Sequence, residues 1–284
     1  MKNFAFILLI IHLCFCEHVF AIESDLKPFS IPRSLVTEVI DLESNRSYPL
    51  FIKLPKSYTK HKDKKYPVIY LTDANYAFQI VSGATRYPMN ANKMSEAIIV
   101  GISYSKNSKR DSSRVRDYTP TINKYWRQQT GGAQQHMEFI EKSVFKYMAQ
   151  HYRVDSNNRT FMGNSLGGLF GSYVLLTKPQ LFKNYILGSP SYWFDNKYIF
   201  RLEAEVAKNI SNINANVFIS IGERETKELE SSYDMVNDAK KFYKKMLAWK
   251  QPNLKTKILI ISDANHQMAF PTTAIHGLHW VLGK

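Results

Sequence analysis

The chain contains little cysteine, and its two cysteines, Cys14 and Cys16, both lie near the N-terminus. The remainder of the sequence has none, so it can form no disulfide bond and offers neither a thiol nucleophile nor a thiolate ligand for a metal. No pair of histidines or carboxylates stands at metal-ligand spacing on an expected helix. These absences exclude thiol chemistry, and we expect no metal site.

Long apolar runs are also scarce. Residues 4–15 form an almost wholly apolar run, which is short of the roughly 20 residues that a membrane-spanning helix needs. Lys2 precedes the run, and Val19-Phe20-Ala21 fits the small-residue rule at a cleavage site. The sequence therefore predicts a signal peptide at residues 1–21, one mature domain at residues 22–284, and export to the periplasm or secretion.

Acidic residues are outnumbered by basic ones. The chain has 24 Asp and Glu against 38 Lys and Arg, a net charge of +14. The cations are scattered in short groups, such as residues 61–65 and 240–245, and no nucleic-acid-binding motif accompanies them. Nucleic acid is therefore not an expected partner. The charge instead suits an anionic small-molecule substrate, or peripheral contact with an anionic envelope surface.

The hydrophobic pattern alternates between strands and helices. Residues 35–40 and 48–54 predict an antiparallel hairpin around a turn at 44–46. Mostly apolar runs typical of buried strands follow at 66–71, 97–102, 158–162, 184–187, 217–221 and 255–262. Helices are expected at 76–84, 134–151, 166–176, 201–208, 231–249 and 270–282. This order predicts one α/β domain with a mostly parallel central sheet and helices on both faces.

The segment around Ser165 carries the strongest chemical signal. Gly163-Asn164-Ser165-Leu166-Gly167 is a Gly-x-Ser-x-Gly motif between a strand-like run and a small, apolar helix. At such a strand-to-helix turn the serine hydroxyl is exposed at the edge of the sheet. The first N–H groups of the following helix can stabilise a developing oxyanion. We therefore predict that Ser165 is a nucleophile and that the Leu166 N–H is one oxyanion donor.

A serine nucleophile needs a base, and the base needs an acid to orient it. His266 follows the last expected strand by four positions, which predicts the base. The acid should follow the strand at 217–221, where Glu223 and Glu225 both stand. Glu225 occupies the place where a Gly-x-x-Asp pattern commonly puts the acid, so it is preferred and Glu223 is the alternative.

The second oxyanion donor should come from the loop that follows the strand at 66–71. Residues 72–76 form that loop, and Asn75 is the favoured donor, with Ala74 as the alternative. Farther along, residues 106–132 are the longest stretch without a clear element. Loops of that length are usually lids or binding loops.

Taken in order, these motifs resemble the esterase family of the α/β-hydrolase superfamily that includes esterase D and the enterobactin and salmochelin esterases. The resemblance extends from about residue 35 to the C-terminus. The segments that carry it are residues 67–73, 114–120, 131–133, 163–168, 189–193 and 222–225, together with His266.

The resemblance implies an α/β-hydrolase fold and a serine esterase that forms an acyl-enzyme and uses no cofactor. Ser165 and His266 match the family's nucleophile and base. Arg116 and Tyr118 would flank the active site and bind substrate, although an Arg–Asp pair that merely holds the loop is an alternative for Arg116. Trp193 would line the acyl pocket or simply pack. Ala74 stands where the family usually has glycine.

Three functions follow as hypotheses. The first is hydrolysis of carboxylic esters, with the catecholate trilactone of a siderophore as one substrate, because the chain is basic and the related esterases act on siderophores. The second is transfer of the acyl group to a sugar. The third is a binding module whose catalytic site has decayed.

Overall fold

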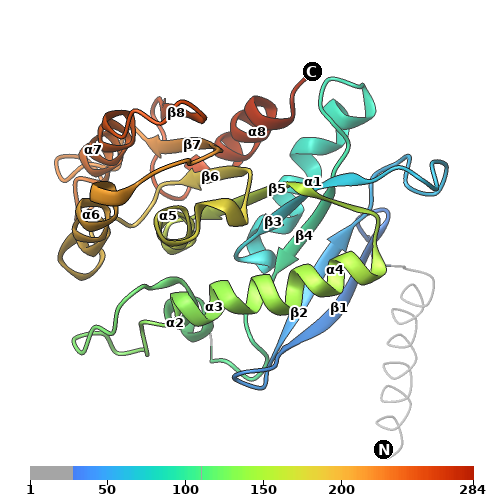
Figure 1. Ribbon diagram of the computed structural model, residues 1–284, viewed down its shortest axis with the longest axis horizontal. Coiled ribbons are helices and arrows are strands. Elements are labelled where there is room, and N and C mark those ends of the chain that lie inside the picture. Colours follow the sequence, from blue (N-terminus) through green and yellow to red (C-terminus); the bar gives the residue numbers. More distant parts are fainter. Residues whose placement is uncertain (1–27, 110) are drawn as a thin grey trace, which may run out of the picture. The chain divides into compact units, whose positions relative to one another are not determined.

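An eight-stranded sheet forms the centre of residues 32–284 (Figure 1). The computed structural model describes residues 28–109 and 111–284, so the predicted signal peptide lies outside the described residues. The strand order is β1-β2-β4-β3-β5-β6-β7-β8. The strands are β1 (Ser34–Asp41), β2 (Arg46–Lys53), β3 (Tyr66–Leu71), β4 (Ile98–Ile102), β5 (Val154–Asn164), β6 (Asn184–Gly188), β7 (Ala215–Gly222) and β8 (Leu254–Ile261).

The sheet is parallel apart from its N-terminal end. β1 pairs with β2 and β2 with β4 in antiparallel register, whereas every later pairing is parallel. The predicted hairpin and the predicted mostly parallel sheet are both confirmed. In a parallel sheet the carboxyl ends of the strands share one edge, so the loops after β3, β5, β6, β7 and β8 gather there.

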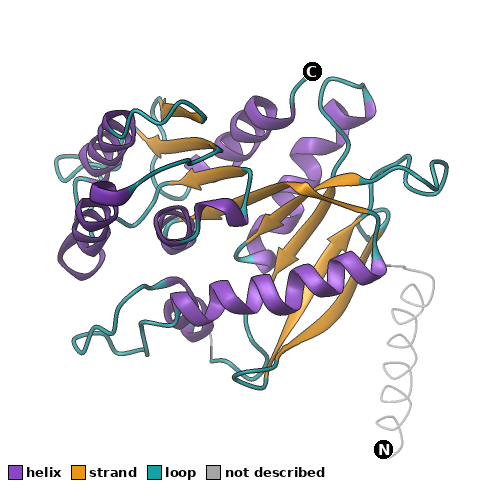
Figure 2. Cartoon of the chain, viewed as in Figure 1, coloured by secondary structure: helices purple, strands orange, loops and turns teal. Residues whose placement is uncertain are grey.

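Helices cover both faces of this sheet (Figure 2). The α-helices are α1 (Ala74–Asn90), α2 (Ser112–Tyr118), α3 (Ala133–Phe139), α4 (Phe145–His151), α5 (Leu166–Thr177), α6 (Phe194–Val206), α7 (Met235–Ala248) and α8 (Ala269–Leu282). Shorter helical segments are the π-helical η1 (Ile140–Val144) and the 3₁₀ turns η2 (Pro179–Leu181) and η3 (Ala207–Asn209). α1 and α8 pack together on one face, while α5 and α7 pack on β5–β6 and β7–β8. None of the described helices is long and apolar enough to cross a membrane.

Strand β7 shows why both faces need helices. Val217, Ile219 and Ile221 belong to the main core cluster together with Phe242 of α7. Phe218, which points to the opposite face, contacts the ring of Trp280 in α8 at a centroid distance of 6.0 Å. Because successive strand side chains alternate between faces, a strand with apolar residues on both faces requires cover on both sides.

Several helical segments differ from the expectation, since α1 continues to Asn90 and α6 begins at Phe194. The stretch 106–132 is not wholly irregular, because it contains α2, in which Val115, Asp117 and Tyr118 are buried. The expected helix at 134–151 is present, but its hydrogen-bond pattern changes to π-helical over η1. A helix as short as α2 has no sequence periodicity that could reveal it, and its formation depends on tertiary contacts.

His136 in α3 is an unusual core residue. It is only 3% exposed, and neither ring nitrogen has a hydrogen-bond partner among the described residues. The rings of Tyr48, Tyr118, Phe139 and Phe170 surround it at centroid distances of 5.3–5.7 Å. Burial lowers the pKa of His136 below its ordinary value of 6.5, since the charged ring has no water to solvate it.

Replacing His136 with phenylalanine is expected to increase the free energy of unfolding by about 1–2 kcal/mol at neutral pH, because two unpaired buried nitrogens are removed. As the pH falls below about 6.5, the unfolded chain takes up a proton that the folded His136 does not, so the wild-type protein loses stability. The variant should lack this component. Urea unfolding of both proteins at several pH values between about 5 and 8 measures it, and the same pH dependence in both would contradict the assignment.

Candidate active site

Ser165 lies at the sharp turn between β5 and α5. Its backbone has a φ of 58° and a ψ of −119°, a conformation that non-glycine residues rarely adopt. The turn is too tight for a side chain two positions before or two positions after the serine. A Cβ at Gly163 would lie 2.5 Å from the carbonyl of Gly167, and one at Gly167 would lie 2.4 Å from Oγ1 of Thr72. The two glycines of the motif are therefore required by close backbone approach.

The same contacts bring the β3–α1 loop against the start of α5, since Thr72 and Asp73 are both close to Gly167. The N–H of Leu166, at the start of α5, has no acceptor among the described residues, and neither does that of Asn75 at the start of α1. Two free N–H donors at neighbouring helix N-termini suit a developing negative charge. The oxyanion roles of Leu166 and Asn75 stay predictions.

Glu225 and His266 are brought together from the loops after β7 and β8. His266 Nδ1–H donates to Glu225 Oε2 over 2.6 Å. The other carboxylate oxygen, Oε1, accepts from Ser189 Oγ at 2.5 Å and from the Gly222 N–H at 2.8 Å. Glu225 is 1% exposed, so these three donors replace the water that a buried carboxylate loses. The bond to Nδ1 leaves His266 Nε2 free to accept a proton.

The alternative acid, Glu223, lies elsewhere. It is exposed, and it accepts hydrogen bonds from Ser262 Oγ at 3.1 Å and from the Asp263 N–H at 2.9 Å. Of the two glutamates, therefore, only Glu225 is in contact with the histidine.

Ser165 contacts a second serine. Its Oγ is 3.1 Å from Oγ of Ser191, and the Ser191 N–H donates to the carbonyl of Ser165 at 3.1 Å. Within the described residues no hydrogen bond joins Ser165 to His266, although catalytic hydrogen bonds are often long or absent in a ligand-free enzyme.

Sequence reasoning used residues 189–193 for the family resemblance but gave Ser189 and Ser191 no role. Both are buried. Ser189 contacts Glu225, and Ser191 contacts Ser165. The available signal was their position directly after β6, at the carboxyl edge of the sheet where polar residues tend to serve the site.

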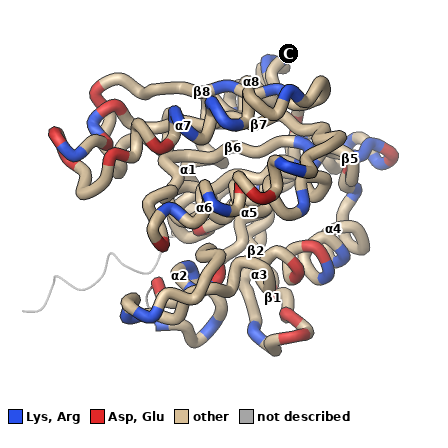
Figure 3. Tube along the Cα trace, turned by 60° about the vertical axis from the view of Figure 1, so that its left-hand side comes forward, with Lys and Arg blue, Asp and Glu red and all other residues tan. Residues whose placement is uncertain are grey.

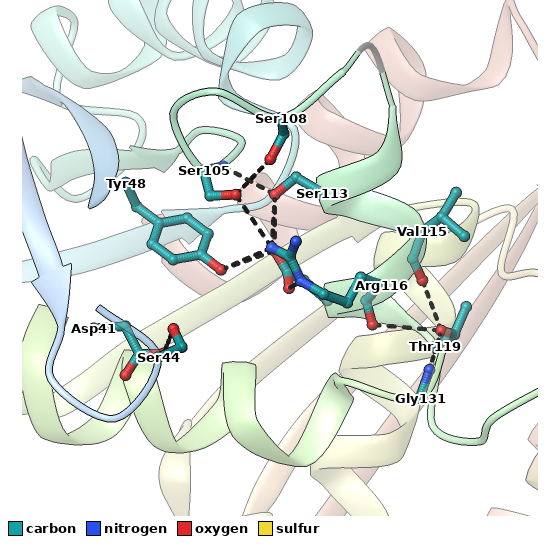
Figure 4. A network of polar contacts seen from close by, with 11 residues as sticks. Asp41, Ser44, Tyr48, Ser105, Ser108, Ser113, Val115, Arg116, Thr119 and Gly131 are labelled. Atoms are coloured by element: carbon teal, nitrogen blue, oxygen red, sulfur yellow. Dashed lines mark hydrogen bonds and ion pairs between the residues drawn. The ribbon is translucent and has the colours of Figure 1, made fainter. Parts of the chain in front are cut away.

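Arg116 is held within the protein (Figure 4). Its guanidinium pairs with the carboxylate of Asp117 at 2.7 and 3.0 Å, and also donates to Tyr48 Oη and Ser105 Oγ, both at 3.2 Å. These contacts favour the alternative considered for Arg116, in which an Arg–Asp pair holds the loop. They leave less reason to propose that Arg116 binds substrate.

Tyr118 also has a partner inside the protein. Its side chain is 1% exposed, and its Oη accepts from the Asp73 N–H at 3.2 Å. The carboxylate of Asp73 accepts from Arg114 Nε at 2.7 Å and from Tyr104 Oη at 2.8 Å. Burial raises the pKa of Tyr118, so the hydroxyl stays protonated. Tyr104, Arg114 and Tyr118 thus fix the turn that begins α1 and presents Asn75.

Trp193 is partly exposed, and its ring stacks on those of Trp126 and Tyr233. Cations are spread over several elements (Figure 3), and Lys240, Lys241, Lys244 and Lys245 form one group on α7. Among residues 28–109 and 111–284, no three His, Cys, Asp or Glu side chains come together in a way that could hold a metal ion.

Comparison with known proteins gives a consistent result. The family model described as "Putative esterase" matches residues 43–253. The chain is 30% identical to ferri-bacillibactin esterase BesA of Bacillus subtilis over 269 residues, which cover 89% of this chain and 91% of that protein. It is 31% identical to the siderophore triacetylfusarinine C esterase of Aspergillus fumigatus over 183 residues, 60% of this chain and 59% of the relative. The crystal structure of the BES protein from Bacillus cereus superposes with a TM-score of 0.81 at 27% identity, covering 93% of this chain and 100% of that one.

Proposed function

The chain belongs to the Putative esterase family of carboxylic-ester hydrolases, and from this premise we propose that it is an exported serine esterase with Ser165, Glu225 and His266 as its triad. The observation that carries the proposal is the 2.6 Å hydrogen bond between His266 and a buried glutamate, formed at the same sheet edge as the strained serine turn. A base fixed in this way is what a serine hydroxyl needs in order to attack a carbonyl.

In the proposed reaction Ser165 Oγ leaves the hydroxyl of Ser191, turns towards His266 Nε2 and attacks the ester carbonyl carbon. The proton of Ser165 passes to Nε2, while the N–H groups of Leu166 and Asn75 stabilise the oxyanion. The tetrahedral intermediate then collapses, the C–O bond to the alcohol breaks, and His266 returns the proton to the leaving oxygen. Water, activated by the same histidine, releases the acid from the acyl-enzyme.

Glu225 keeps the imidazole in one orientation and one tautomer throughout these steps, and it stabilises the imidazolium that forms. Ser189 and the Gly222 N–H hold the carboxylate from its other side at 2.5 and 2.8 Å. We assign Ser189 as a positioning residue on this basis.

For the substrate we propose an ester bond in an anionic siderophore. Two relatives carry the names of siderophore esterases, and a net charge of +14 would attract an anionic iron chelate by long-range electrostatics. The predicted signal peptide would bring the enzyme to a compartment outside the cytoplasm, where such chelates are met.

The test compares a ferric catecholate trilactone, its iron-free form and p-nitrophenyl acetate as substrates of the purified protein. We expect a kcat/KM for one of the trilactones at least about 100-fold above that for the acetate, because an esterase gains specificity by binding the remote parts of its substrate. Chromatography identifies the products, with and without an acceptor sugar. Efficient cleavage of the acetate with untouched trilactones would rule out the siderophore proposal, and an acyl-sugar product would show a transferase.

A further inference from the structure

Three aromatic side chains form a stack beside the proposed site. Trp193 and Tyr233 are nearly parallel, with a centroid distance of 4.4 Å and an angle of 2° between the rings. Trp126 lies on Trp193 at 6.1 Å and 14°. We call Trp126, Trp193 and Tyr233 the aromatic ladder.

The ladder is attached to the segments that carry the triad. Trp193 follows Ser191 by two positions, and Ser191 is bonded to Ser165 through both its hydroxyl and its N–H. Tyr233 precedes Met235 by two positions, and the Met235 N–H donates to the carbonyl of Glu225 at 3.0 Å. Two residues of extended chain span at most about 7 Å. The Cα atoms of Trp193 and Tyr233 therefore lie within about 7 Å of the Cα atoms of Ser191 and Met235, which are hydrogen-bonded to the proposed nucleophile and acid.

Polar contacts hold the loop that supplies Trp126. Thr121 Oγ1 and Asn123 Nδ2 donate to the carboxylate of Asp195 at 2.7 and 3.3 Å, and Thr130 Oγ1 accepts from the Asn123 N–H at 2.7 Å. The loop is therefore fastened to the turn after Trp193. A stack whose members are held before a ligand arrives loses little conformational entropy when it binds one.

The ladder is open to solvent at Tyr233. Tyr233 is 42% exposed, and Trp193 is the only described residue whose ring contacts it. Neither indole N–H of the ladder donates to a described residue, and neither indole nitrogen is among the buried polar atoms that lack a partner, so both are open to solvent. An open aromatic face beside two solvent-accessible N–H donors is suited to a flat ring that carries oxygen atoms.

We propose that the aromatic ladder binds a planar aryl group of the ester substrate by extending the stack at Tyr233, and that it makes the enzyme select aryl-bearing over alkyl-bearing esters. This inference rests on the proposed esterase function. The occupant is an aromatic ring rather than an alkyl chain because offset stacking adds attraction beyond the burial of apolar area. The indole N–H groups can donate to oxygens on the ring or on the carbonyl next to it.

The experiment uses two ethyl esters that differ only in ring planarity, N-benzoyl-L-serine ethyl ester and N-cyclohexanecarbonyl-L-serine ethyl ester. The quantity compared is the kcat/KM for the benzoyl ester divided by that for the cyclohexanecarbonyl ester. In the wild-type protein we expect this ratio to exceed about 5. In the Tyr233→Leu variant we expect it to fall about 3- to 10-fold, the range for loss of one aromatic pair. The control is Tyr125→Leu, because Tyr125 is on the same loop as Trp126 but is 99% exposed and outside the ladder. This control should leave the ratio unchanged.

A binding measurement with a ligand that has no ester bond tests the ladder independently of the proposed esterase activity. N-benzoyl-L-serinamide has no ester bond, and its titration followed by tryptophan fluorescence should give a dissociation constant that rises at least about 3-fold in Tyr233→Leu and not in Tyr125→Leu. If neither ester is cleaved but this difference appears, the esterase proposal fails and the ladder remains an aryl site. A wild-type ratio near 1, or equal binding by the wild type and Tyr233→Leu, would overturn the inference.

Discussion

Replacing Ser165 with alanine is expected to lower kcat for ester hydrolysis by about 10⁴- to 10⁶-fold, because the nucleophile of the acyl-enzyme is lost and only binding and oxyanion stabilisation remain. The fold should persist, since alanine keeps the Cβ and leaves the backbone strain at φ 58° unchanged, and the only side-chain hydrogen bond lost among the described residues is the one to Ser191 Oγ. Initial rates with the best substrate of the wild-type protein, together with thermal unfolding of both proteins, measure the two effects.

The matched control is Ser191→Ala, which removes the hydroxyl that contacts Ser165 at 3.1 Å and leaves the proposed triad intact. This variant should keep kcat within about 10-fold of the wild-type value, because a hydrogen bond between neutral partners contributes only about 0.5–1.5 kcal/mol. Comparable turnover by Ser165→Ala and the wild type would show that another group attacks the ester. Equal loss in both variants would make Ser191 as important as Ser165 and would contradict the proposed division of roles.

Replacing Glu225 with glutamine is expected to lower kcat by about 10³- to 10⁴-fold. The amide can still contact His266, but it favours the wrong tautomer and leaves the imidazolium without a negative partner. A buried carboxylate with three donors is also part of the fold, so a thermal-unfolding measurement must accompany the kinetics. Saturation kinetics separate an effect on kcat from an effect on KM.

Glu223→Gln provides the control for this change. Glu223 is two positions away and exposed, and its partners are Ser262 and the N–H of Asp263. Its replacement should change kcat less than about 3-fold, as is usual for an exposed residue outside the site. A severe defect in Glu223→Gln with a mild one in Glu225→Gln would reverse the proposed choice of acid.

Much of the strand pattern of this chain could be predicted because the central strands contain apolar runs bounded by polar or turn residues. Residues 66–71 and 217–221 are examples, and β3 and β7 contain them. Local sequence was also sufficient to predict the tight turn at Ser165, since the Gly-x-Ser-x-Gly spacing reflects a steric requirement of that turn. The choice between Glu223 and Glu225, by contrast, rested on spacing alone, because either side chain could have faced His266.

Features that depend on distant contacts were not accessible from sequence. α2 is too short to show a period, and it is stabilised by Arg114 and Tyr118, which reach Asp73 from the far side of a long loop. Ser189 and Ser191 acquire their importance only when β6 is placed between β5 and β7. The ladder likewise assembles from three loops, so no local pattern reveals that Trp126 and Tyr233 stack on Trp193.

The central claim, an activated serine at position 165, is tested most directly with a fluorophosphonate probe, because such a probe reacts with a serine only when a neighbouring base has raised its nucleophilicity. Folded protein is incubated with the probe and the adduct is located by peptide mass spectrometry, in parallel with a His266→Ala variant. We predict a single adduct on Ser165 in the wild-type protein and labelling at least about 100-fold slower in the variant, the scale of a lost general base. A folded wild-type protein that forms no adduct, or forms it on a different residue, would contradict the claim.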